Sequence, residues 1–254
     1  MFKEENQIWL YLIGILIFFG VLVAGSANIL APVVQSGNIG LLFQSQKFAS
    51  RPELTINSGL DYYADVATSK GTFTINLYAS KAPQNVNNFI YLAKNGFYTD
   101  TKFHRIVPNL LIQGGDRNTL NSDLTDDGKG RTGYLIEDES NWDAIDLSKE
   151  QRSRLTTIGF SSTSGLETTK FKQYSVAMAN GGPNTNSSQF FIITANSDDT
   201  RLGSLDGQYT IIGEITTGKQ VIDAINSVSV NDATLNAPTP VEQITFQSIT
   251  IYTR

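Results

Sequence analysis

Cysteine is absent from the 254-residue chain, and histidine occurs once, as His104. Without thiols the protein can form no disulfide, no thiolate zinc site and no cysteine nucleophile. One imidazole is too few for a multi-histidine metal site, and we expect neither a metal nor a cofactor. Basic runs are also missing, since 19 Lys and Arg stand against 24 Asp and Glu, a net charge of −5. Because sequence-independent nucleic-acid binding needs clustered positive charge, we expect no nucleic-acid partner.

The rest of the composition is that of a folded protein. Hydrophobic residues make up 40% of the chain and charged residues 17%, with 21 Gly and 7 Pro. These values exclude a disordered, collagenous or coiled-coil protein. The length suits one large domain or two small ones, and we find no internal repeat.

The N-terminal region lacks charge over a long distance. No charged residue occurs from Asn6 to Gln46, and residues 8–24 are apolar or glycine throughout. Extended to Ala27, this run would form a helix of about 30 Å, the thickness of the hydrocarbon core of a bilayer. A signal peptide cleaved at Gly25-Ser26-Ala27 is the alternative. The barely basic start and the length of the run favour a transmembrane anchor at residues 1–27.

The orientation of this anchor sets the expected location of the rest of the chain. Lys3 and the amino terminus favour a cytoplasmic N-terminus, which places the remainder outside the cytoplasm. We expect a membrane-anchored, extracytoplasmic protein, secreted if the chain is cleaved near Ala27. Residues 28–53 hold Gly, Ser, Gln and two Pro without a clear period and are expected to be a linker. Residues 54–254 remain as one domain.

The hydrophobic pattern of this domain is mostly that of strands. Alternating or short apolar runs predict strands at residues 62–68, 72–78, 176–178, 190–194, 210–215 and 244–252. A helix is predicted to begin at Pro83 and to end before Asn95-Gly96. A second, at residues 218–228, carries Val221, Ile222 and Ile225 on one face.

Helices near both ends of a set of strands, without βαβ alternation, argue against a doubly wound sheet. We therefore expect a mainly β fold, a closed antiparallel barrel capped by two helices, with an open α+β sheet as the alternative. The polar region 141–173 is expected to contain a further helix, Ser148–Thr157. Ser148 and Gln151 have the spacing of a capping box at its start.

Three features have a plain structural interpretation. Residues 128–133 fit G-x-G-x-x-G, but they follow an acidic stretch rather than an apolar strand, so we expect a flexible loop. Asp123, Asp126 and Asp127 lack the alternate spacing of a calcium loop and are expected to be solvated. His104 lies among apolar residues and is expected to be a packed structural histidine rather than the base of a hydrolase.

Two longer segments are of a different kind. Residues 103–116 read F-H-R-I-V-P-N-L-L-I-Q-G-G-D, and residues 175–192 read S-V-A-M-A-N-G-G-P-N-T-N-S-S-Q-F-F-I. Together with L-D-G-Q-Y-T-I-I-G at residues 205–213, they closely resemble the signature stretches of the cyclophilins, which are peptidyl-prolyl cis-trans isomerases. The resemblance covers about residues 60–252, with a longer middle region at 141–173.

The resemblance implies an eight-stranded closed barrel with two capping helices, and it assigns roles to individual residues. Arg105 would donate to the prolyl nitrogen, Gln113 would hold its guanidinium, and Asn180 would pin the peptide. Ala179, Gly181 and Gln189 would line the same groove. The apolar proline pocket would consist of Leu110, Leu111, Phe191, Leu205 and Tyr209. No metal or cofactor is implied.

Some pocket positions depart from the family pattern. Leu110 stands where the family usually has Phe, Leu111 where it has Met, and Tyr209 where His is frequent. Together with the apolar N-terminus, the resemblance predicts an isomerase that assists the folding of extracytoplasmic proteins and acts on unfolded or extended proline-containing polypeptides, with a monomeric catalytic domain. The altered pocket leaves an alternative, a proline-segment binding module without turnover. A weaker hypothesis gives residues 141–173 a role in docking a partner.

Overall fold

The structure, a computed structural model, describes residues 48–232 and 237–254. The predicted membrane anchor at residues 1–27, and most of the predicted linker at residues 28–53, lie outside these ranges. Within them, no helix combines the length and apolar character needed to cross a bilayer.

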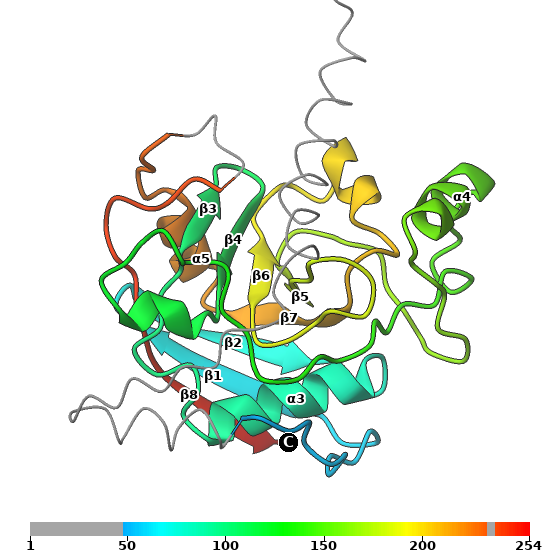
Figure 1. Cartoon of the computed structure of the whole chain (residues 1–254), viewed down its shortest axis with the longest axis horizontal. Coiled ribbons are helices and arrows are strands. Elements are labelled where there is room, and N and C mark those ends of the chain that lie inside the picture. Colours follow the sequence, from blue (N-terminus) through cyan, green and yellow to red (C-terminus); the bar gives the residue numbers. More distant parts are fainter. Residues whose placement is uncertain (1–47, 233–236) are drawn as a thin grey trace, which may run out of the picture.

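Eight strands form one antiparallel sheet with the order β3-β4-β6-β5-β7-β2-β1-β8 (Figure 1). The strands are β1 (Tyr62–Thr68), β2 (Gly71–Leu77), β3 (Arg105–Val107), β4 (Leu111–Gly114), β5 (Ser175–Met178), β6 (Phe190–Ile193), β7 (Ile211–Thr217) and β8 (Phe246–Thr253). The mainly β prediction is confirmed, and most predicted strands differ from the observed ones by one or two residues.

The sheet curls, but the two edge strands β3 and β8 are not paired in a ladder. Their flanking residues meet at one isolated bridge, between Lys102 and Thr245. Beside it, the Phe103 amide donates to the Ile244 carbonyl (3.0 Å). Two further backbone hydrogen bonds lie next to it, from the Asp100 amide to the Phe246 carbonyl and from the Phe246 amide to the Thr101 carbonyl, both at 2.8 Å. We call these contacts between residues 100–103 and 244–246 the seam. The expected closed barrel is therefore corrected to a curled sheet whose edges touch only at the seam.

The short β3 strand explains why the edges do not pair further. The amide of Ile106, in the middle of β3, donates to the carbonyl of Pro238 at 2.9 Å instead of to β8. Beyond β3 the chain turns at Pro108 and at Asn109, whose φ of 57° is left-handed. An edge strand of three residues with its central amide already engaged cannot continue a ladder with β8.

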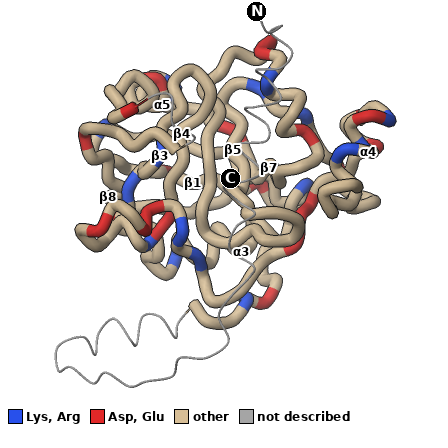
Figure 2. The backbone as a smooth tube through the Cα atoms, turned by 45° about the horizontal axis from the view of Figure 1, so that its top comes forward, with Lys and Arg blue, Asp and Glu red and all other residues tan. Residues whose placement is uncertain are grey.

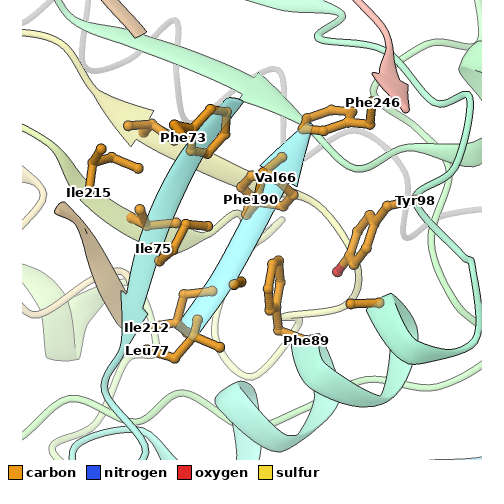
Figure 3. Packing of buried hydrophobic residues seen from close by; sticks show 14 of the residues in the cluster. Val66, Phe73, Ile75, Leu77, Phe89, Tyr98, Phe190, Ile212, Ile215 and Phe246 are labelled. Carbon is orange, nitrogen blue, oxygen red and sulfur yellow. The ribbon is translucent and has the colours of Figure 1, made fainter. Parts of the chain in front are cut away.

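The two helices predicted near the ends of the strands are present as α3 (Pro83–Lys94) and α5 (Lys219–Asn226). Pro83 stands at the start of α3, where its missing N–H costs no helix hydrogen bond. Helix α3 packs against β8, and α5 packs against β2 and β4. The main core lies between these helices and the inner face of the sheet, with Phe73, Phe89 and Phe190 at its centre (Figure 3).

A third helix, α4 (Lys149–Thr157), confirms the prediction for the middle region. The Gln151 amide donates to Ser148 Oγ at 3.2 Å, and the Ser148 amide donates to Gln151 Oε1 at 3.0 Å, which completes the capping box. Two 3-10 helices, η1 (Arg117–Leu120) and η2 (Thr200–Ser204), connect other parts of the sheet.

Candidate active site

The candidate site begins at the β3–β4 hairpin, where Arg105 lies directly opposite Gln113. Arg105 Nη1 donates to Gln113 Oε1 at 3.0 Å, and Gln113 Nε2 donates to Gln189 Oε1 at 2.9 Å. Gln189 Nε2 in turn donates to the carbonyls of Gly128 (3.0 Å) and Gly130 (2.7 Å). This chain of amides gives each glutamine one orientation and fixes the guanidinium from one side.

The 128–133 segment is a loop, as predicted, and it is not followed by a helix. It is tied down more firmly than a flexible loop would be, because its carbonyls hold Gln189 and its Gly130 amide donates to the buried Asp116 at 3.0 Å. Within the described ranges, no three acidic or histidine side chains gather as a metal site.

Strand alternation explains how the site shares its strands with the core. Successive side chains of a strand point to opposite faces. In β6, Phe190 and Ile192 pack into the inner core, while Phe191 and Ile193 pack on the outer face. The unbroken apolar run of β6 is therefore buried on both sides.

The outer face carries a second apolar cluster, which we call the outer cluster. Its buried members are Leu111, Phe171, Ala177, Phe191, Ile193, Ala195, Leu202, Tyr209 and Ile211, edged by the partly buried Tyr78, Val107, Leu110, Ala179 and Leu205. The Tyr209 ring meets Phe191 edge-on at 5.2 Å between centroids, and the Phe171 ring stacks on Phe191 at 5.9 Å. All five residues predicted to form the proline pocket thus come together in one cluster.

Arg105 and Gln113 lie on this same outer face, since Val107 and Leu111 of their strands belong to the outer cluster. Burial lowers the pKa of Arg105 from its ordinary value, with the neighbouring Tyr209 acting in the opposite direction. The guanidinium nevertheless stays protonated at neutral pH. The outer face thus places a fixed cation next to an apolar surface.

Asn180 is held at the other side of the site by its side chain. Its Nδ2 donates to the Gln208 carbonyl at 3.0 Å, one residue before Tyr209. The buried carboxylate of Asp138 braces the same loop, because it accepts from the Asn184 amide at 2.6 Å and from Asn186 Nδ2 at 3.1 Å. Burial raises the pKa of Asp138 to about 6.

The remaining predicted groove residues occupy different depths. The Ala179 amide donates to the Gln189 carbonyl at 2.9 Å, and Ala179 is partly buried. Gly181 is exposed, and its amide donates to Thr185 Oγ1 at 2.8 Å. Gln189 is buried and contacts Gln113 rather than open groove. The roles assigned to these residues stay predictions, but their positions converge on one region.

His104 confirms the prediction of a packed structural histidine, with 7% of its surface exposed. Burial lowers its pKa to about 4, and the charge of Arg105 adds to this shift, while the Lys102 backbone and Gln189 oppose it. The neutral imidazole is packed next to Gly128 and Gln189, at the end of the chain of amides that holds Arg105.

Phe171 and Asp138 are among the residues of the site that sequence reasoning missed. Phe171 belongs to the outer cluster, and its only signal was an isolated aromatic residue at the end of the polar 141–173 region. Asp138 stands in an acidic run, Glu137-Asp138-Glu139, in which nothing distinguishes the buried carboxylates from the exposed one.

Comparisons with known proteins agree with this geometry. The model of the family described as "Cyclophilin type peptidyl-prolyl cis-trans isomerase/CLD" matches residues 63–251. Peptidyl-prolyl cis-trans isomerase-like 1 of Emericella nidulans is 38% identical over 165 residues, which cover 65% of this chain and 82% of that protein. Peptidyl-prolyl cis-trans isomerase CYP18-2 of Arabidopsis thaliana is 33% identical and covers 77% of this chain and 90% of its own length.

Solved structures show the same likeness. A crystal structure of a cyclophilin type peptidyl-prolyl cis-trans isomerase of Cryptosporidium parvum superposes with a TM-score of 0.56 at 25% identity, over 76% of this chain and 99% of that chain. A second structure of the Cryptosporidium protein, in the presence of the dipeptide Ala-Pro, gives a TM-score of 0.55 at 25% identity, with the same coverage of 76% and 99%.

Proposed function

Because the chain belongs to the cyclophilin-type peptidyl-prolyl cis-trans isomerase family and is an enzyme of that class, we propose that Arg105 and the outer cluster form its catalytic site. The observation that carries this proposal is the Arg105–Gln113–Gln189 chain of hydrogen bonds beside the Phe191–Tyr209 ring pair. The proline ring would rest on the apolar surface while the guanidinium faces its nitrogen.

The reaction needs only stabilisation of a twisted amide. Amide resonance sets a barrier of about 18–20 kcal/mol, and X-Pro bonds isomerise in tens to hundreds of seconds without a catalyst. Raising a rate of about 0.01 per second to about 10 per second takes about 4 kcal/mol. The catalyst must bind the twisted form more tightly than either planar form.

Arg105 supplies an interaction that grows during the twist. As the amide rotates, the lone pair localises on the prolyl nitrogen, which becomes a hydrogen-bond acceptor. A hydrogen bond to a charged group contributes about 1.5–3 kcal/mol, and a fixed donor in a partly desolvated site contributes more. Gln113 holds Nη1 from one side, so the guanidinium need not be ordered when substrate arrives.

A proline-peptide isomerisation assay on the purified full chain tests this site. We expect Arg105→Ala to lower kcat/KM by about 10- to 100-fold, as the loss of one charged hydrogen bond implies. Lys70→Ala removes one positive charge at a surface ion pair on the β1–β2 hairpin and should leave the rate unchanged. Equal rates for Arg105→Ala and the wild-type enzyme would remove Arg105 from the mechanism. Peptide binding by NMR without faster cis–trans exchange would favour the alternative of a binding module.

We further propose that the enzyme is a bacterial-like, membrane-anchored member that acts outside the cytoplasm, as a monomer, on unfolded or newly exported proline-containing chains. The absence of charge from Asn6 to Gln46 supports the anchor. The Cryptosporidium relative solved in the presence of Ala-Pro supports proline-containing peptides as ligands.

Fractionation and N-terminal sequencing test this location. The full chain should be recovered from membranes with Met1 or Phe2 at its start. In cells whose outer layers are made permeable while the plasma membrane stays intact, added protease should cut residues 54–254. Recovery from the cytosolic fraction, or protection from the protease, would contradict the proposal. Light scattering checks the monomer.

A further inference from the structure

The middle region 141–173 folds around an apolar cluster of its own. This cluster contains Trp142, Ile145, Leu147, Leu155 and Phe160, and Ile158 packs against it. Helix α4 stands beside the sheet, next to η2, and carries charges of both signs (Figures 1 and 2). The region is thus a small folded unit rather than a loose polar loop.

This unit binds directly to the segment 203–207, which leads into the outer cluster. Trp142 Nε1 donates to the Gly207 carbonyl at 3.0 Å, and Gln151 Nε2 donates to the Gly203 carbonyl at 3.1 Å. Between these contacts, Arg154 Nη2 donates to the Ser204 carbonyl at 3.1 Å. Because Leu205 follows Ser204 directly, the guanidinium of Arg154 lies at one wall of the proposed proline pocket.

Arg154 is a partly buried cation of α4 that forms no ion pair with a described carboxylate. Arg152, two residues earlier, pairs with Asp143 at 2.7 Å and also donates to the Leu147 carbonyl. Among the ion pairs formed between described residues, none includes Arg154. Its side chain forms one hydrogen bond within the part of the chain that the structure describes, to the Ser204 carbonyl, which leaves most of its five donors without an acceptor among those residues.

The charge of Arg154 reaches the pocket itself. Burial raises the pKa of Tyr209, and both Arg105 and Arg154 oppose that rise. Two guanidiniums from different parts of the chain therefore lower the pKa of the same tyrosine of the outer cluster. Asp138 raises the pKa of Tyr209, but its carboxylate already accepts hydrogen bonds from the Asn184 amide and from Asn186 Nδ2.

We propose that Arg154 is a specificity-determining residue that makes the enzyme prefer peptides with Asp or Glu next to the isomerising proline. The inference rests on the proposed site at Arg105 and adds a substrate class to it. A guanidinium has the planar donor geometry that binds a carboxylate bidentately, and the Ser204 carbonyl holds it at the pocket wall. The unit at residues 141–173 thus contributes to substrate choice.

The test compares two pairs of proline peptides on the full chain, each pair differing only by Glu or Gln immediately before or immediately after the proline. At low salt we expect the wild-type enzyme to favour the Glu peptide of at least one pair by about two- to fivefold in kcat/KM, the range of a partly exposed ion pair. Arg154→Gln should bring that ratio to about one, with turnover of the Gln peptides nearly unchanged. Arg154→Lys keeps the charge but not the planar pair of donors, so it should keep only part of the preference.

A matched control separates local contact from overall charge. Lys149→Gln removes the same charge from the same helix at an exposed position and should keep the wild-type ratio. Salt near 1 M, where the Debye length is about 3 Å, should shrink the ratio toward one.

The outcomes distinguish this inference from the proposed site. A ratio that Arg154→Gln does not change overturns it, as does an equal loss of turnover on the Glu and Gln peptides, which would mark a purely structural residue. Arg105→Ala should lower turnover of all the peptides together. If Arg105→Ala stays fully active while the ratio still responds to Arg154, the proposed role of Arg105 fails and the inference on Arg154 stands.

Discussion

At the level of the single residue, the site depends on side chains that fix other side chains. Two glutamine amides connect Arg105 to the carbonyls of Gly128 and Gly130. An amide that donates at one end and accepts at the other has one usable orientation. The position of the guanidinium therefore depends on the backbone of a loop that contributes no side chain to the site.

His104 gives a prediction about pH. Its pKa is about 4 in the folded protein and about 6.5 when unfolded, so the unfolded state binds the extra proton between these values. The stabilisation from neutral His104 is fully present above pH 6.5 and is lost as pH falls toward 4. We expect a loss on the order of 3 kcal/mol from this group in urea unfolding.

The variant His104→Gln isolates this contribution. It cannot titrate, so the difference in unfolding free energy between wild type and variant should shrink as pH falls from 7 to 4. Asp138 makes a contribution to the pH dependence of stability that has the opposite sign, because its raised pKa of about 6 removes stability as pH rises. This contribution is the same in both proteins, so it cancels in the difference between their unfolding free energies. A difference that stays constant with pH would contradict the assignment.

The sequence predicts some residues of the site and not others. The residues that the resemblance predicted for the pocket lie in one cluster, because family motifs fix spacing within each strand and turn. Arg154 and Phe171 carry no such motif. They reach the site through the folding of the 141–173 unit, and no local pattern reports contacts between residues that lie about 20 and 50 positions apart in the chain.

At the level of helices and strands, local signals were sufficient for most elements. The predicted strand at residues 62–68 coincides with β1, and Pro83 and the Ser148 capping box mark the starts of α3 and α4. The Arg105 segment is less simple, since Pro108 and the left-handed Asn109 divide it into the two short strands β3 and β4. That division is what places Arg105 opposite Gln113.

Gly207, where the 141–173 unit packs on the segment that leads into the pocket, should tolerate no larger side chain. Gly207 has a φ of 77°, and a Cβ there would lie 2.5 Å from Leu147 Cδ1. We expect Gly207→Ala to lower the free energy of unfolding by about 3 kcal/mol through strain and overpacking, and to raise KM by shifting Leu205 and Tyr209. Urea unfolding and the isomerisation assay measure both effects.

Gly203→Ala is the matched control at the other end of the same segment. A Cβ at Gly203 meets no atom within 4 Å, and its φ is not left-handed. Its effect on stability should stay within about 0.5 kcal/mol. Similar losses for the two substitutions would show that the 141–173 unit does not pack on Gly207.

For the molecule as a whole, closure of the sheet could not be read from the sequence. Strand patterns report which face is buried, but whether two edges meet depends on distant segments such as the one that places Pro238 against Ile106. At the seam, side chains add to the backbone contacts, since the rings of Phe103 and Phe246 lie 4.4 Å apart between centroids.

The seam predicts where the sheet opens first. Phe246→Ala should lower the unfolding free energy by about 3–5 kcal/mol and speed amide exchange at Asp100 and Phe103, whose hydrogen bonds cross the seam, more than at Val66 in β1. Native-state hydrogen exchange by NMR measures this. Ile251→Ala, elsewhere in β8, should destabilise the protein without singling out the seam amides. Uniform acceleration in Phe246→Ala would contradict the prediction.

The two faces of strand β6 have a practical consequence. The same four residues support the inner core with one set of side chains and form the proposed substrate surface with the other. Because the core and the proposed substrate surface share this strand, heat should abolish catalysis and melt the fold at one temperature. The turnover that remains after a heating step should therefore equal the fraction of molecules that are still folded, so an activity assay reports thermal unfolding directly.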